Sequence, residues 1–219
     1  MKIGKNAKLV LIGDSITSGA RNFNLGGEGR QDEAYGSSYT LLLKSFLDAC
    51  YPERHIRVVN KGVGGHTIKD LEERWERDVI EQKPDWLSVM IGINDVWRQF
   101  DSPLTTDQHV SPNTFRETYR KLLGEARHKL DLQGLIVASP YLIDSNQEDT
   151  MRAQMDVYRA ISREVAAEFD AIYVDTQKAF DAYLEHYHPN QLCWDRIHPS
   201  MSGHMLIARE WLKAVDFEW

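Results

Sequence analysis

Short apolar runs recur along the chain, separated by longer stretches with a helical pattern. The runs are four to six residues long and nearly all-apolar, as is typical of strands buried on both faces of a parallel sheet. They cover residues 9–12, 56–59, 86–91, 135–138 and 171–174. The sequence therefore predicts five parallel strands.

The stretches between these runs have the spacing of amphipathic helices. In residues 68–80, for example, Leu71, Trp75 and Val79 recur at a spacing of four and would share one helix face. We predict the other helices at residues 37–49, 115–130, 150–169, 175–184 and 199–215. Strands that alternate with helices in this way favour an α/β fold, with helices on both faces of the sheet.

Two longer connections lack such a pattern. Residues 18–36 contain five glycines and are predicted to form a loop. Long loops often serve as lids or rims of a site, and a flexible insertion is the alternative here. Residues 96–113 are interrupted by Pro103 and Pro112, so a second long connection is expected there.

Composition narrows the class of protein. With 219 residues and no internal repeat, linker or change in composition, the chain is expected to form a single domain, residues 1–219. The formal net charge is −7 and no run of lysine or arginine occurs, which argues against nucleic acid and membrane surfaces as partners. Without the apolar core of a signal peptide, the protein is expected to be cytoplasmic, with Cys50 and Cys193 as free thiols.

Polar residues collect where the predicted strands end. Ser15 follows the first run, at the edge where an open α/β sheet places its ligand crevice. A serine there can be a helix N-cap or a nucleophile. Residues 62–65, rich in glycine, follow the second run, but they lack the spacing of a dinucleotide or phosphate loop. Asn94 and Asp95 follow the third run, where an Asx turn is the alternative interpretation.

The last polar stretch supplies an acid and a base. Asp195 and His198 are three residues apart, so one turn can bring the carboxylate to the imidazole Nδ1. A helix start with a structural histidine is the alternative. Acyl transfer needs a hydroxyl, an imidazole, a carboxylate and donors to the oxyanion. Ser15 with this pair, a glycine N–H and the Asn94 amide together meet that need.

The blocks Gly13-Asp14-Ser15, a glycine in 62–65, Gly92-x-Asn94-Asp95 and Asp195-x-x-His198 resemble the four ordered blocks of the SGNH (GDSL-type) hydrolases over nearly the whole chain. The resemblance implies a flavodoxin-like three-layer α/β/α sandwich with a five-stranded parallel sheet. The family contains esterases, lipases, thioesterases and carbohydrate deacetylases.

The resemblance also implies a role for each residue. Ser15 would be the nucleophile, His198 its base and Asp195 the carboxylate that orients the base. The oxyanion would be bound by the Ser15 N–H, the Gly65 N–H and the Asn94 side chain. Gly64 replaces the usual serine of the second block, so the choice of Gly65 over Gly64 or Gly62 rests on alignment alone. The implied mechanism needs no metal and no organic cofactor.

Within the family, several stretches resemble intracellular bacterial acetylxylan esterases. They are residues 56–62, 82–86, 91–98, 194–200 and 217–219. This resemblance implies removal of O-acetyl groups from a small acetylated carbohydrate, with xylo-oligosaccharides as the expected substrate. The alternatives are a lipase or thioesterase acting on longer acyl chains, and a non-catalytic carbohydrate-binding module.

A few aromatic and charged residues complete the predictions. Trp97 and Trp194 lie within four residues of proposed catalytic groups and are predicted to bind substrate, although tryptophan is commonly a core residue. Arg98 is predicted to bind substrate or to pair with a carboxylate. Trp211 and Trp219 suggest a homo-oligomer interface, with core packing as the alternative.

Overall fold

The sheet occupies the centre of the computed structural model, which describes residues 1–219. Its strands are β1 Lys8–Gly13, β2 Arg57–Gly62, β3 Trp86–Met90, β4 Gly134–Ala138 and β5 Ile172–Val174. They lie in the order β2-β1-β3-β4-β5, and every neighbouring pair is parallel. All five predicted strands are confirmed, with bounds that differ by at most three residues.

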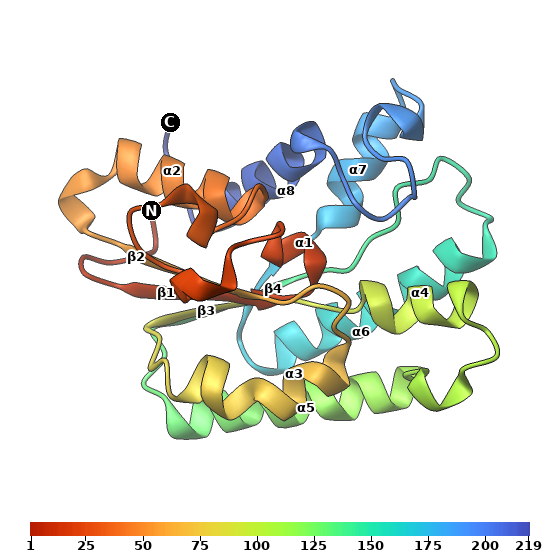
Figure 1. The fold of residues 1–219 in the computed structure, drawn as a ribbon, viewed down its shortest axis with the longest axis horizontal. Coiled ribbons are helices and arrows are strands. Elements are labelled where there is room, and N and C mark those ends of the chain that lie inside the picture. Colours follow the sequence, from red (N-terminus) through yellow and green to blue (C-terminus); the bar gives the residue numbers. More distant parts are fainter.

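Helices cover both faces of this sheet (Figure 1). One layer contains α1 Ser15–Ser18, α2 Tyr39–Cys50, α7 Thr176–Leu184 and α8 Met201–Ala214. The other contains α3 Ile68–Trp75, α4 Ile93–Asp101, α5 Pro112–Lys129 and α6 Thr150–Glu168. A π-helical turn, Glu76–Ile80, extends α3 to the predicted end of that helix. A cluster of 57 buried hydrophobic residues lies between the layers, and with the strand order it confirms the flavodoxin-like α/β/α architecture.

The carboxyl ends of three strands meet at one edge of the sheet. Gly13 at the end of β1 lies opposite Gly62 of β2 and Met90 of β3. A Cβ at Gly13 would lie 2.3 Å from the Met90 carbonyl oxygen, and one at Gly62 would lie 2.2 Å from the Ser18 nitrogen. These two glycines therefore let α1 start directly on the sheet, and the segments after the three strands lie together.

The prediction of a long connection at residues 96–113 is wrong in its first part. Helix α4 begins at Ile93, inside the Gly92-x-Asn94-Asp95 block, and continues to Asp101. Ile93 and Val96 are buried in the core and give the helix its packed face. The helix was missed because polar block residues fill its first turn. Only the segment after it, up to the start of α5, is a connection.

Residues 18–36 pack against β2. They contain two short 3₁₀ turns, Phe23–Leu25 and Asp32–Ala34. The Asn60 N–H donates to the Gly27 carbonyl at 2.7 Å, and the Asn60 side chain donates to the Tyr35 carbonyl at 2.8 Å. Asn60 thus ties this segment to β2 at two points, which favours a rim packed on the sheet over a flexible insertion.

The C-terminal tryptophans differ in burial. Trp211 is fully buried and donates its indole N–H to the Ser88 hydroxyl at 3.0 Å, so it is a core residue and not part of an interface. Trp219 is 71% exposed and packs edge-on against Phe46. A homo-oligomer interface therefore stays a prediction. Both cysteines are free, as predicted.

Candidate active site

Ser15 is the first residue of α1, directly after β1. Asp14 caps this short helix, because its Oδ1 accepts the Ile16 N–H at 2.9 Å. The Ser15 N–H, at the first helical position, has no partner within the helix. The Ser15 Oγ lies 2.9 Å from His198 Nε2, across 183 residues of sequence. The turn therefore exposes both the hydroxyl and the backbone donor of Ser15 at the edge of the sheet.

Asp195 fixes the imidazole of His198. Its Oδ2 lies 2.6 Å from His198 Nδ1, and its Oδ1 accepts the backbone N–H groups of His198 at 2.8 Å and Ile197 at 3.0 Å. Burial opposes the charge, but these hydrogen bonds hold the pKa of Asp195 below its usual value. An ionised carboxylate keeps a proton on Nδ1 and leaves Nε2 free to accept the proton of Ser15.

Arg196, between the acid and the base, joins their loop to the segment after β4. Its φ is +71°, a left-handed conformation that is uncommon for a side chain of this size. The Ile143 N–H donates to the Arg196 carbonyl at 2.9 Å. The guanidinium lies 2.6 Å from Asp144 and 2.8 Å from Asp149, as charge contacts rather than directed hydrogen bonds. Sequence reasoning missed this residue, because nothing local connects it with positions about 50 residues away.

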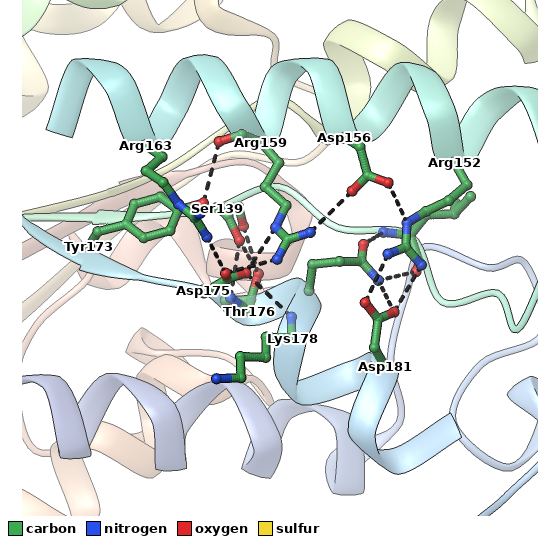
Figure 2. A network of polar contacts seen from close by, with 12 residues as sticks. Ser139, Arg152, Asp156, Arg159, Arg163, Tyr173, Asp175, Thr176, Lys178 and Asp181 are labelled. Carbon is green, nitrogen blue, oxygen red and sulfur yellow. Dashed lines mark hydrogen bonds and ion pairs between the residues drawn. The ribbon is translucent and has the colours of Figure 1, made fainter. Parts of the chain in front are cut away.

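A buried polar network supports the segment after β4 in turn. Gln177 accepts the Leu142 N–H at 2.7 Å and donates to the Leu142 carbonyl at 3.0 Å. The same side chain donates to Asp181, whose carboxylate takes a bidentate pair of hydrogen bonds from Arg152, each 2.8 Å long. Figure 2 shows Arg152 of α6 reaching Asp181 of α7, with Arg159 and Arg163 converging on Asp175 beside it. The acid–base loop thus rests on a segment that is itself held by two helices.

The loop after β2 provides candidate oxyanion donors. The Gly62 N–H is occupied by Asn60 Oδ1 at 2.8 Å, which removes Gly62 from the candidates. The N–H groups of Gly64 and Gly65 make no hydrogen bond within the protein. Gly65 has a φ of +81°, which glycine adopts at little cost. Gly64 and Gly65 therefore both stay available as donors.

Asn94 and Arg74 hold this loop in place. Asn94, in the first turn of α4, donates one side-chain N–H to the His66 carbonyl at 3.0 Å, which leaves its second N–H available. Arg74 of α3 is buried and donates to the carbonyls of Gly13 at 2.8 Å and Lys61 at 2.6 Å, and to His66 Nδ1 at 3.1 Å. Arg74 thereby ties the ends of β1 and β2 to the loop. No signal in the sequence distinguished it from its charged neighbours.

Two buried carboxylates lie beside these groups. Asp14 and Asp95 are fully buried, and burial raises the pKa of each to about 7. In both, Oδ1 accepts a backbone N–H while Oδ2 has no hydrogen-bond partner. Asp95 receives its hydrogen bond from Ile68 at 3.0 Å and so joins the start of α3 to α4. Both residues act on the backbone next to the site.

The residues predicted to bind substrate differ in how they are placed relative to His198. The Trp97 ring lies edge-on to the His198 ring, with centroids 5.8 Å apart. The Arg98 guanidinium stacks 5.0 Å from the Trp97 ring centre and forms an ion pair with Asp101 at 2.5 Å, which confirms the predicted pairing. Trp194 is 87% exposed and borders a hollow that His198 also lines. Trp97 and Trp194 therefore lie next to His198, whereas Arg98 is connected with it only through Trp97.

Other kinds of site find little support. No group of three or more His, Cys, Asp or Glu side chains is arranged to hold a metal ion. None of the helices combines the length and the apolar character needed to cross a membrane.

A family model described as the GDSL-like lipase/acylhydrolase family matches residues 11–206, which include all the blocks above. The chain belongs to this family. It is therefore a carboxylic-ester hydrolase, and the family resemblance drawn from its sequence blocks is confirmed.

Individual proteins also resemble the chain over its full length. It is 47% identical to an acetylxylan esterase of Geobacillus stearothermophilus over 219 residues, which are 100% of this chain and 98% of that protein. The crystal structure of that esterase, Axe2, matches with a TM-score of 0.96 at 46% identity, over 100% of this chain and 98% of the other. The structure of an α/β hydrolase from the metagenome of Lake Arreo, Spain, matches with a TM-score of 0.95 at 49% identity, over 99% of this chain and 98% of the other.

Proposed function

We propose that this GDSL-family hydrolase removes O-acetyl groups from carbohydrate, with xylo-oligosaccharides as its substrate and an acetyl-serine intermediate. The contact of Ser15 with His198, and of His198 with Asp195, carries the proposal for the mechanism. The similarity to an acetylxylan esterase over the whole chain supports the substrate class. Axe2 variants described as catalytic mutants carry alanine in place of a serine, an aspartate or a histidine, the three residue types assigned here.

In the acylation step, the Ser15 hydroxyl is the nucleophile and the His198 imidazole transfers the proton. The Ser15 Oγ attacks the acetyl carbonyl carbon while its proton passes to His198 Nε2. Asp195 stabilises the imidazolium that forms. When the tetrahedral intermediate collapses, the bond from the carbonyl carbon to the sugar oxygen breaks, and His198 gives its proton to that oxygen. The deacetylated sugar leaves, and the acetyl group stays on Ser15 as an ester.

Deacylation repeats the same steps with water. His198 takes a proton from the water molecule that attacks the acetyl-serine carbonyl. The bond to Ser15 Oγ then breaks, His198 returns the proton to that oxygen, and the product leaves as acetic acid, which ionises to acetate in water. The negative oxygen of both tetrahedral intermediates would be bound by the Ser15 N–H, the Gly65 N–H and the second N–H of Asn94. Gly64 is the alternative donor from the same loop.

Three side chains near His198 are assigned to the sugar. Trp97 and Trp194 present aromatic surfaces suited to a sugar ring, and Arg98 borders the oxyanion loop. Trp97 also limits the space beside His198, which favours a small acyl group over a long chain.

Acetate release from acetylated xylo-oligosaccharides, by wild type and by Ser15→Ala, tests the proposal. We expect release by wild type and a loss of at least three orders of magnitude in the variant. Cleavage of p-nitrophenyl acetate separates mechanism from substrate. Serine-dependent cleavage of this ester without release from the sugar would contradict the carbohydrate assignment alone. Unchanged cleavage by Ser15→Ala would contradict the nucleophile.

A further inference from the structure

A cavity of about 440 Å³ opens next to Gly65, within the size range of small-molecule sites. Its walls come from the loop and helix that follow β2, and from Arg98 of α4 and the turn beyond it. None of its eight lining residues is hydrophobic. Among these eight residues only Gly65 and Arg98 have a role in the proposed function, and the other six take no part in the acetyl transfer.

The cavity borders the reaction centre through two glycines. An ideal Cβ on Gly64 would lie 3.8 Å from the Ser15 Cβ, and one on Gly65 would lie 3.7 Å from the Arg98 Nη2. No side chain projects from this strip between the nucleophile and the cavity. Arg98 in turn stacks on Trp97, whose ring contacts His198. A substrate held at Ser15 can therefore extend across Gly65 into the cavity.

The lining offers hydrogen bonds without net charge. Two basic residues, Lys69 and Arg98, face two acidic ones, Asp70 and Glu73. The side chains of Glu73 and Gln108 form no hydrogen bond within the protein, and Arg98 uses only Nη1, for Asp101. Free donors and acceptors of both kinds, with no apolar wall, suit a neutral ligand with many hydroxyl groups. They do not suit an acyl chain, and the balanced charges do not favour an ion.

We propose that this cavity binds the sugar units next to the acetylated one, on the leaving-group side of the ester. This inference rests on the proposed function and adds the length of saccharide that the site recognises. Arg98, Glu73 and Gln108 supply the hydrogen bonds to the neighbouring sugar. The acetylated unit itself stays at Ser15, between Trp97 and the glycine strip.

Steady-state kinetics on acetylated xylose and acetylated xylotetraose test the cavity. For wild type, we expect a higher kcat/KM on the tetrasaccharide, mainly through a lower KM. Glu73→Ala and Gln108→Ala should each lower the ratio of the two kcat/KM values roughly three- to tenfold, the effect of one lost hydrogen bond. Glu81→Ala is the matched control: an exposed glutamate that follows the same helical segment and lies outside the cavity, so the ratio should stay at its wild-type value.

Three outcomes would overturn the inference. Equal kcat/KM for both sugars in wild type would show that only one unit is recognised. If Glu73→Ala and Gln108→Ala lower kcat/KM equally on both sugars, the two substitutions act on the fold or on the reaction centre. If Trp194→Ala lowers the ratio of the two kcat/KM values and the two cavity variants leave it unchanged, the neighbouring sugar lies on the other side of His198. If no acetylated sugar is cleaved while p-nitrophenyl acetate is, the carbohydrate assignment itself fails.

Discussion

Asn94, at the carboxyl end of β3, holds the glycine loop and is also proposed to bind the oxyanion. One of its side-chain N–H groups holds the His66 carbonyl at 3.0 Å and so fixes the glycine loop, while the other is free for the oxyanion. The residue is 1% exposed, so solvent competes little for that second donor. A donor kept in place before the reaction stabilises the developing charge without reorganisation.

We expect Asn94→Ala to lower kcat by about two to three orders of magnitude, the usual effect of one lost oxyanion donor, with a small change in KM. Steady-state kinetics on p-nitrophenyl acetate, with the melting temperature of each variant, checks this. Gln99→Ala is the control, because it removes another amide of α4 that bonds only to Asp95, Val110 and Tyr158. That variant should lose stability and keep its kcat. An unchanged kcat in Asn94→Ala would remove Asn94 from the oxyanion hole.

At the same scale, the residues proposed to react could be picked out from the sequence, whereas the residues that support them could not. Ser15, Asn94, Asp195 and His198 lie in short blocks whose residue types fit one chemistry and whose order fits one family. Arg74 acts through contacts to strand ends and a loop that come together only in the fold. An arginine in a charged helical segment gives no sign of such contacts.

Helices, strands and loops also differ in how well the sequence predicts them. The strands were predictable because a buried parallel strand is recognisable from its own residues. Helix α4 was not, since its first turn consists of block residues and its packed face is short. The acid–base loop depends on the segment after β4, and that pairing of two loops has no periodic signal at all. Arg196 tests how much the pairing matters.

We expect Arg196→Gly to lower kcat roughly tenfold while KM and the melting temperature change little. Glycine relieves the positive φ, and the lost ion pairs involve a side chain that is 37% exposed as a whole, so the two effects on stability are opposite and partly cancel. The loss of kcat would come from a looser His198, because a small displacement of a catalytic group is costly.

Lys83→Gly is the control for Arg196→Gly. Lys83 also has a positive φ, of 48°, and lies far from the site before β3, so its kcat should stay at the wild-type value. Kinetics and thermal unfolding of both variants decide the question. A parallel fall of kcat and melting temperature in Arg196→Gly would mean that the arginine serves only the fold.

For the whole molecule, buried acids make stability depend on pH in two opposite ways. Burial raises the pKa of Asp14 and Asp95 to about 7, so the folded state holds protons that the unfolded state has released. Between about pH 4 and pH 7 these two groups therefore reduce stability as the pH rises. Asp175, although burial opposes its charge, has a lowered pKa because Arg159 and Arg163 surround it (Figure 2). The stability that Asp175 contributes to the folded state is present at neutral pH and is lost in acid.

Asp95→Asn should therefore become more stable relative to wild type as the pH rises from 5 to 8, by up to a few kcal/mol for one fully buried carboxyl. The asparagine keeps the acceptor for the Ile68 N–H and cannot ionise. Asp175→Asn should behave in the opposite way: its loss of stability relative to wild type should be largest at neutral pH and should decrease in acid. The free energy of unfolding in urea, measured at pH 5 and pH 8 for wild type and both variants, gives the comparison. A difference between Asp95→Asn and wild type that does not change with pH would mean that Asp95 carries the same charge in the folded and unfolded states.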